Sequence, residues 1–240
     1  MSKILFLADL HGNMTATHAL EKEMKKIAPD DVYFVGDCVG KGPENDKTLE
    51  WVRSNCKHFV AGNWDDGIVK GSKNCLPEYE ASHFFWDQLS KEQLDWLESL
   101  PFEDEVLISG LNFRIFHGRP TDQNFHSWLN PAELAPAFTN KAGKKFDGFI
   151  CADCHQAYIR ETENGFAINT GSVGNALGVP RCHALLIEGD LGCMERTPIR
   201  FTTLDIPYDN QLAAEIARNC PELPQQEAYI NEVLTGIYSR

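Results

Sequence analysis

Residues 3–13 read KILFLADLHGN, in which an apolar run, Ile4 to Ala8, gives way at once to a polar loop that carries Asp9 and His11. The same pattern occurs twice more before residue 66. Those runs and their loops are Asp31–Val35 with Gly36-Asp37, and Lys57–Val60 with Gly62-Asn63. Segments with a helical pattern, 14–27 and 46–54, separate the runs. Short apolar runs that alternate with helical segments predict βαβ units on a parallel sheet.

The three polar loops follow the carboxyl ends of the predicted strands. In open α/β sheets these ends lie at one edge, and ligands bind there. We therefore expect Asp9, Asp37 and Asn63 to be neighbours in space, at the place where chemistry occurs.

A helical insertion and a β-hairpin are predicted next. Residues from about 77 to 100 carry no strand pattern, and Ser90-Lys91-Glu92-Gln93 is a capping box that opens a helix. The hairpin strands are 106–109 and 113–116, joined by a turn at Gly110-Leu111-Asn112.

The remaining chain predicts a short helix, more strands and a helical tail. Asn130-Pro131-Ala132-Glu133 has the residues of a helix start. Further strands are expected at 148–152, 157–161, 166–169 and 183–188, and a helical tail at about 209–238. Because we find no repeat, low-complexity tract or linker, we expect one α/β domain over residues 1–240 with a helical insertion.

The composition is that of a packed, acidic globular chain. Of the 240 residues, 42 % are hydrophobic and 24 % charged, which excludes disordered, collagen-like and coiled-coil chains. The net charge of −13 argues against a nucleic-acid duplex as a partner. The aliphatic runs are too short to span a bilayer, and the first residues lack signal-peptide architecture. We expect a cytoplasmic protein without a membrane partner; the sequence carries no indication of its oligomeric state.

The eight cysteines are dispersed along a chain too long to need a disulfide framework. Reduced, mostly buried thiols are expected. Cys151 and Cys154 form one CxxC pair, which supplies two of the four ligands of a tetrahedral zinc site. A thiol-based function through this pair is a minor alternative, which predicts activity that is lost on Cys→Ser exchange and indifferent to chelators.

Asp, His and Asn side chains follow strand ends at five places in the chain. These residues are Asp9, His11, Asp37, Asn63, His117, Asp153 and His155. Two hard divalent cations about 3.5–4 Å apart need roughly seven protein ligands, one of them a carboxylate that contacts both ions. The chain supplies such a set.

The spacing of these residues suggests their roles. Asp9 and His11 are two residues apart, so both should point to one side of a strand end, and Asp153 and His155 repeat the spacing. Asp37 stands alone after its strand and is the expected bridge between the ions. Asn63 can offer a carbonyl oxygen to an ion and an N–H to a bound anion. We expect Asp37 and Asn63 to be catalytic as well as metal-binding.

Together and in this order, the fragments resemble the calcineurin-like metallophosphoesterase superfamily, whose motifs run D-x-H, G-D, G-N-H-D, G-H or H-G, and G-H-x-H. The similarity covers nearly the whole chain. It extends to Leu10–Asn13, Gly40-x-Gly42-Pro43, His117-Gly118-x-Pro120, Asn169–Gly174 and Ile206–Asp209. The last segment resembles a small bacterial and archaeal branch that includes phosphodiesterases and diadenosine-tetraphosphatase-like proteins.

This resemblance implies a four-layer sandwich of two mixed β-sheets flanked by helices, with two metal ions at one edge. The implied ligands are Asp9, His11, Asp37 and His155 for the first ion, and Asp37, Asn63, His117 and Asp153 for the second. It also implies that a metal-activated hydroxide hydrolyses a small substrate: a phosphodiester, a phosphomonoester or a nucleoside polyphosphate. The alternative is a degenerate fold of this family that acts as a non-catalytic scaffold, which would hold little metal.

Trp64 departs from the family's pattern. It stands where the family has the histidine credited with protonating the leaving group, and an indole cannot exchange a proton near neutral pH. General-acid help is worth about 10²- to 10⁴-fold, so we expect a preference for leaving groups that depart without a proton, such as nucleoside polyphosphates or aryl esters. Alternatively, Trp64 packs over the site, and His83 or His126 supplies the proton.

Asp153 is the second departure, because the family has the first histidine of G-H-x-H there. Three carboxylates against two dications leave the ligand set at +1 instead of +2, which should weaken the attraction for a phosphate dianion. A carboxylate in place of an imidazole favours harder ions, so we expect manganese or iron ahead of zinc. Alternatively, Asp153 faces solvent, and the second metal site is weak or empty.

Asn13 and Arg119 are the candidate substrate-binding residues. Arg119 follows His117-Gly118 and can hold a phosphate oxygen with its planar fork, or lie on the surface. Asn13 stands at the start of the first helix, where N–H groups favour an anion, or is only the helix cap. The aromatic run 84–86 is expected in the core, a base-stacking lid being the alternative.

Overall fold

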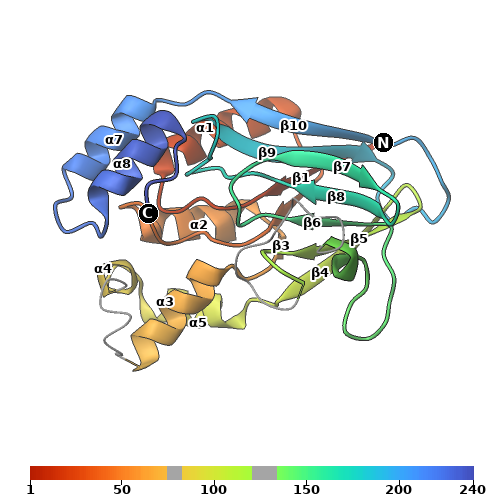
Figure 1. Ribbon diagram of the computed structural model, residues 1–240, viewed down its shortest axis with the longest axis horizontal. Coiled ribbons are helices and arrows are strands. Elements are labelled where there is room, and N and C mark those ends of the chain that lie inside the picture. Colours follow the sequence, from red (N-terminus) through yellow and green to blue (C-terminus); the bar gives the residue numbers. More distant parts are fainter. Residues whose placement is uncertain (75–82, 121–133) are drawn as a thin grey trace.

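The computed structural model describes residues 1–74, 83–120 and 134–240. Two five-stranded sheets form its centre (Figure 1). The first sheet consists of β1 (Ser2–Leu7), β2 (Asp31–Phe34), β3 (His58–Phe59), β9 (Cys182–Gly189) and β10 (Arg200–Ile206), in the order β10-β9-β1-β2-β3. The strands β1, β2 and β3 are parallel, as predicted, whereas β9 pairs antiparallel with both β1 and β10.

The second sheet is also mixed. Its strands are β4 (Glu103–Ile108), β5 (Leu111–Phe116), β6 (Gly148–Cys151), β7 (Tyr158–Thr162) and β8 (Gly165–Asn169), in the order β4-β5-β6-β8-β7. Both β5 and β8 run parallel to β6, so the carboxyl ends of β5 and β6 point to the same edge.

Strand alternation explains why the two sheets stack. Along β1, Leu5 and Leu7 point into a core beneath helices, whereas Ile4 and Phe6 point into a second core between the sheets. Successive side chains of a strand face opposite sides, so a strand that is apolar throughout must be covered on both faces. The chain is therefore an α/β sandwich of two mixed sheets flanked by helices.

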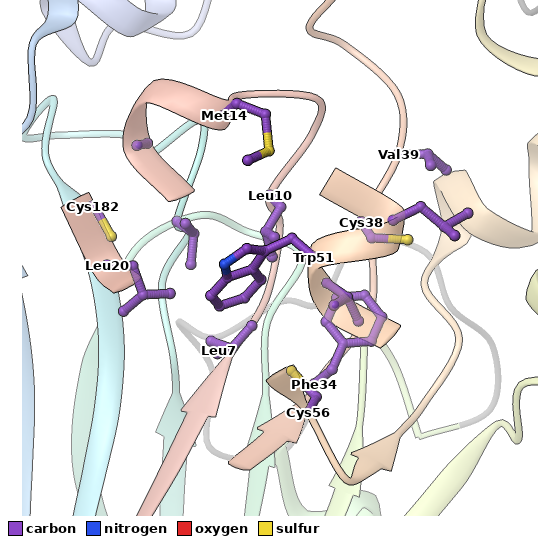
Figure 2. Close-up of a cluster of buried hydrophobic side chains, with 14 of the residues drawn as sticks. Leu7, Leu10, Met14, Leu20, Phe34, Cys38, Val39, Trp51, Cys56 and Cys182 are labelled. Carbon is purple, nitrogen blue, oxygen red and sulfur yellow. The ribbon is translucent and has the colours of Figure 1, made fainter. Parts of the chain in front are cut away.

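Helices cover the outer face of the first sheet. They include α1 (Met14–Ile27), α2 (Asn45–Asn55), α7 (Asn210–Arg218) and α8 (Gln226–Thr235). In Figure 2, the Trp51 side chain of α2 lies at the centre of this core, with Leu7, Leu20 and Phe34 around it. The helices thereby hold the β1 and β2 ends in place.

The outer face of the second sheet carries a smaller core. Phe116, Phe149 and Cys151 pack there against the 3-10 helix η2 (Ala135–Phe138). The helix start expected at 130–133 lies outside the described residues.

The predicted insertion is helical but begins earlier than expected. It contains α3 (Asn63–Asn74), α4 (His83–Trp86) and α5 (Lys91–Ser99). We did not predict α3, because its first residues read as a loop in the sequence. The capping box of α5 is confirmed: Gln93 N donates to Ser90 Oγ at 3.2 Å, and Ser90 N donates to Gln93 Oε1 at 2.8 Å.

Two further details differ from the prediction. The hairpin turn consists of Ser109 and Gly110, at φ 51° and 73°, so the turn predicted at 110–112 was placed too far along. Positive φ at both positions is typical of a two-residue hairpin turn. The edge strand β10 was missed because its exposed polar residues break the apolar pattern. Among the described residues, no helix is long and apolar enough to cross a membrane.

Candidate metal centre

Five of the seven candidate ligands lie just beyond strand ends on backbone with positive φ. Asp9 and His11 have φ of 54° and 46°, Asp37 has 62°, and Asp153 and His155 have 65° and 59°. Left-handed backbone is costly for residues with a side chain and persists where the surroundings impose it. We had expected the pleat of the strands to orient these side chains. Instead, sharp turns after the strands orient them.

Asp65 holds the turn around Asp37. Its carboxylate accepts hydrogen bonds from the backbone N–H groups of Asp37 at 2.8 Å, Cys38 at 3.0 Å and Gly62 at 3.0 Å. A side chain at Gly62 would overlap the carboxylate of Asp37. Burial, followed by the charge of Asp37, raises the pKa of Asp65 to about 6. The loops after β2 and β3 are thus joined through one buried carboxylate.

Asp9, His11 and His155 form the first group of potential ligands. Nε2 of His11 and Nε2 of His155 lie 3.6 Å and 3.5 Å from Oδ1 of Asp9, and 3.1 Å from each other. All three residues are buried.

Asp9, Asp37 and His117 form the second group. Nε2 of His117 lies 3.3 Å from Oδ2 of Asp37 and 3.8 Å from Oδ1 of Asp9. Asp37 also reaches the first group, because its Oδ2 lies 3.6 Å from Nε2 of His11. Both Asp9 and Asp37 therefore lie between the two groups, where the sequence suggested Asp37 alone.

Asn63 and Asp153 adjoin the second group. One end of the Asn63 side-chain amide lies 3.1 Å from Nε2 of His117, 3.1 Å from Oδ1 of Asp153 and 3.2 Å from Oδ2 of Asp37. The Asp153 side chain is only 8 % exposed and lies 3.8 Å from Nε2 of His117. It does not face open solvent. The structure thus brings all seven predicted residues together.

The three histidines present the same nitrogen to the cluster. Nδ1 of His11, His117 and His155 donates to the backbone carbonyls of Val39, Val35 and Asn175, at 2.5–3.0 Å. Each Nε2 therefore carries a lone pair that faces the carboxylates. Backbone carbonyls commonly orient metal-binding imidazoles in this way.

The Asp9 carboxylate indicates that this set of residues is suited to bind a cation. Both of its carboxylate oxygens are buried, and neither accepts a hydrogen bond from residues 1–74, 83–120 or 134–240. Buried acceptors without donors are rare in folded proteins because their desolvation is not compensated. A divalent ion compensates carboxylate oxygens and imidazole nitrogens together, so the residues present fit a metal centre.

Burial and neighbouring charges shift the pKa values of the clustered side chains. Burial, reinforced by Asp37 and Asp153, raises the pKa of Asp9 well above its usual range. Burial and Lys41 lower the pKa values of His11 and His155 well below theirs. Although burial opposes it, the carboxylates raise the pKa of His117.

A pocket of about 650 Å³ opens onto Asp37, Asn63, Asp153 and His155. Its volume is that of a small-molecule site. Its wall also contains Lys41, Trp64, Tyr238 and Arg240.

Sequence reasoning missed Lys41 and Arg240. Lys41 is buried, and its Nζ lies 3.4 Å from Nε2 of His155 and 3.2 Å from Oδ1 of Asn175. Burial, followed by the charge of Arg240, lowers the pKa of Lys41 to about 8. Lys41 lies within the Gly40-x-Gly42 motif, which could have identified it as a candidate. The sequence around Arg240 carries no such signal.

The two expected substrate-binding residues do not line this pocket. Asn13 is the cap of α1: its Oδ1 accepts from Ala16 N at 3.0 Å, and its Nδ2 donates to the Gly174 carbonyl at 2.7 Å. The capping alternative therefore describes its contacts. Arg119 is exposed and lies outside the pocket wall.

Trp64 packs within the site. The centroid of its ring lies 5.9 Å from that of His11 and 5.6 Å from that of Phe85, and both contacts are edge-on. A side chain at Gly40 would overlap the indole. Of the two histidines considered as proton donors, His83 packs on Trp86 away from the pocket wall, and His126 lies outside the described residues.

The aromatic insertion and the thiols have ordinary structural roles. Phe85 and Trp86 are buried in the helical core, as expected. Cys151 and Cys154 are buried free thiols, and burial raises the pKa of Cys154 to about 12. Protonated thiols are poor nucleophiles and poor metal ligands, so the geometry disfavours a thiol-based function.

Comparisons with known proteins place these observations in a family. The model of the calcineurin-like phosphoesterase superfamily domain matches residues 2–190. The uncharacterized protein MJ0912 of Methanocaldococcus jannaschii is 26 % identical over 176 residues, which are 72 % of this chain and 70 % of that protein.

Two crystal structures share the fold along almost the whole chain. A metallophosphoesterase from Sphaerobacter thermophilus superposes with a TM-score of 0.77 at 22 % identity, over 98 % of this chain and 99 % of that one. The hypothetical protein PH1004 from Pyrococcus horikoshii OT3 superposes with a TM-score of 0.76 at 17 % identity, over 100 % of both chains.

Proposed function

The chain belongs to the calcineurin-like phosphoesterase superfamily, and we propose that it is a metal-dependent hydrolase of small phosphorylated compounds. Candidate substrates are phosphodiesters, phosphomonoesters and nucleoside polyphosphates. The observation that carries the proposal is the buried Asp9 carboxylate, which has no hydrogen-bond donor in the described part of the chain, while three imidazole Nε2 atoms face the same cluster.

Two divalent ions are proposed, held by the ligand sets that the sequence suggested. His11 and His155 would bind the first ion, His117, Asn63 and Asp153 the second, and Asp9 and Asp37 lie within reach of both groups. When bound, such ions activate a nucleophile near neutral pH and neutralise charge that develops on the phosphoryl oxygens.

The pocket residues bind and orient the phosphate. The ammonium group of Lys41 lies beside His155 and can donate to a non-bridging phosphate oxygen. With a pKa of about 8, Lys41 is largely protonated at neutral pH. The Asn63 amide can donate to a second oxygen, a contact that an aspartate could not make.

Trp64 supports the proposal that the leaving group departs without a proton. Among the described residues of the pocket wall, His155 is the only histidine, and its Nδ1 is already bonded to a carbonyl. No described imidazole of the wall is therefore available as a general acid. We propose that aryl esters and phosphoanhydrides, whose leaving groups are weak bases, are hydrolysed better than alkyl monoesters.

The ligand chemistry supports manganese or iron rather than zinc. Carboxylate and amide oxygens outnumber the imidazole nitrogens, and hard oxygen donors suit such ions. The Cys154 thiol lines the pocket, but it donates to the Gln156 carbonyl and its pKa is raised by burial.

Metal analysis beside a substrate panel tests this function. Protein dialysed against EDTA should be inactive, and Mn²⁺ should restore hydrolysis of bis-p-nitrophenyl phosphate, p-nitrophenyl phosphate or a nucleoside polyphosphate. Asp37→Asn should abolish the restored activity, whereas Asp66→Asn, on the exposed side of α3, should retain it. Protein that neither retains metal nor hydrolyses any of these compounds would be a scaffold instead.

A further inference from the structure

Hydrogen bonds hold residues 236–240 beside the pocket. Helix α8 ends at Thr235, and Gly236, at φ 71°, turns the chain back. The buried carboxylate of Glu232 then accepts a hydrogen bond from Ser239 N at 3.1 Å, and Gly178 N donates to the Gly236 carbonyl at 2.8 Å. These contacts fix the direction from which Arg240 enters the site.

Arg240 has one guanidinium nitrogen without a partner. Its Nε donates to Oε2 of Glu232 at 3.0 Å, and its Nη1 donates to Oε1 of Gln225 at 3.2 Å. Its Nη2 is buried and makes no hydrogen bond to the residues that the structure describes, and the side chain is 9 % exposed. The residue lines the same pocket as Asp153 and His155. A buried charged donor without an acceptor is costly, so this group is poised for an acceptor that enters the pocket.

Arg240 and Lys41 are linked through the buried carboxylate of Glu232. Oε2 of Glu232 also accepts from Nδ2 of Asn175 at 3.1 Å, and Oδ1 of Asn175 accepts from Lys41 Nζ at 3.2 Å. Two buried cations, Lys41 and Arg240, thus share one buried carboxylate. Asp9 and Asp37 also offset the charge of Lys41, so the group left without an acceptor is Nη2 of Arg240, and a bound anion would supply one.

Lys41 and Arg240 occupy different positions relative to the ligands. Lys41 lies against Nε2 of His155, beside the first ligand group. Arg240 is separated from Lys41 by the Asn175–Glu232 link and makes no hydrogen bond to a candidate ligand. An anion held by Arg240 is therefore a different group from the phosphate held at the ligands.

We propose that Nη2 of Arg240 binds a second phosphate group of the substrate, next to the phosphate that is hydrolysed. The position of the first phosphate rests on the proposed function. The planar guanidinium suits phosphate oxygens, and its anchoring by Glu232 and Gln225 leaves little side-chain entropy to lose on binding. The preferred substrates are then compounds with two phosphates in series, such as nucleoside diphosphates and polyphosphates, ahead of simple monoesters and diesters.

Calorimetric titration with two probes tests this subsite without relying on turnover. Orthophosphate and methylenediphosphonate, a non-hydrolysable diphosphate, are titrated into the protein at one buffered free Mn²⁺ concentration. We expect the wild type to bind methylenediphosphonate at least about tenfold more tightly. Arg240→Gln should lower the affinity for methylenediphosphonate about tenfold and that for orthophosphate by less than about threefold.

A control separates this effect from a general loss of positive charge. Arg181 is 45 % exposed, lies near Asp205 and is outside the pocket wall, so Arg181→Gln should shift neither affinity. Arg240→Lys, which keeps the charge, should retain part of the preference and carries the same test if the glutamine variant folds poorly.

Equal losses for both probes in Arg240→Gln, or no loss for either, would overturn the subsite. A wild type that hydrolyses no phosphoester but whose diphosphonate binding depends on Arg240 would refute the proposed hydrolysis and support the subsite. The two failures are thus distinguishable.

Discussion

Nε2 of His11 and Nε2 of His155 lie 3.1 Å apart, although 144 positions separate the two residues in the sequence. Because Nδ1 of each ring donates to a backbone carbonyl, both facing nitrogens carry lone pairs. Two neutral acceptors at this distance repel each other unless a cation lies between them.

Removing one of these imidazoles should reduce the amount by which metal binding stabilises the folded protein. For the wild type, Mn²⁺ at about 100 times its Kd should add about 2.7 kcal/mol to the free energy of unfolding and raise Tm by roughly 5–10 °C. His155→Ala should lose most of this increase, and His18→Ala, exposed on α1, should keep it. Scanning calorimetry with EDTA or Mn²⁺ measures both, and an undiminished increase in His155→Ala would contradict the metal centre.

Replacing the indole of Trp64 should change the leaving-group preference. Trp64→His introduces a group that can protonate a basic leaving oxygen, so turnover of an alkyl phosphomonoester should rise at least about tenfold relative to p-nitrophenyl phosphate. Trp96→His, which removes an indole that packs on Phe59, is the matched control. The idea fails if the wild type already hydrolyses both esters equally well.

Changing Asp153 should alter anion affinity and metal content. Asp153→His removes one negative charge beside His117, so orthophosphate should bind several-fold more tightly and zinc content should rise relative to manganese. Asp153→Asn separates charge from ligand type, because it removes the charge without adding an imidazole. Unchanged phosphate affinity and metal content in both variants would refute this role.

Lys41 should make stability depend on pH in a defined window. The pKa of Lys41 is about 8 in the folded protein, below its ordinary value of 10.5. Between these values the unfolded chain binds more protons, so the contribution of Lys41 to stability rises with pH through this window, and its burial penalty is complete below about pH 8.

In EDTA-treated protein, Lys41→Met should therefore raise the free energy of unfolding by about 1–3 kcal/mol at pH 7. The gain should shrink at pH 10, and urea unfolding at both pH values measures it. Lys47→Met, at an exposed position on α2, is the control. A gain of equal size at both pH values would assign the effect to packing instead of charge. We expect the same variant to bind orthophosphate more weakly.

Asp65 should be necessary for the turn that holds Asp37. In Asp65→Asn, an NH₂ group replaces one of the two oxygens that accept backbone N–H groups, which leaves a buried donor without an acceptor. The expected loss is about 1–3 kcal/mol in the free energy of unfolding, with weaker metal binding. Asp66→Asn, whose side chain pairs with Lys70 on the surface of α3, should lose less than about 0.5 kcal/mol. Equal unfolding energies for the two variants would contradict this role.

Much of the fold could be predicted because its signals are local. The bounds of α1, 14–27, agree with the helical periodicity, and the Ser90–Gln93 capping box starts α5. By contrast, β10 forms through pairing with β9, and its polar residues give no apolar run. The helix that begins at Asn63 was missed because its first residues also read as a loop.

The sequence by itself determined which residue types stand beyond which strand ends. Strand periodicity and the polar loops are local properties, and they placed Asp9, Asp37 and Asn63 at one edge of the sheet, whereas the resemblance to the family implied the other four ligands. The tertiary structure decided how the side chains reach one another: Oδ1 of Asp9 lies 3.6 Å from Nε2 of His11 and 3.8 Å from Nε2 of His117, so Asp9 adjoins both groups. That position depends on left-handed backbone at the turn, which the sequence pattern does not reveal. The positions of Lys41 and Arg240 likewise follow from the contacts of Glu232 on α8 with Asn175 and Arg240, because long-range burial, unlike periodicity, leaves no pattern in neighbouring residues.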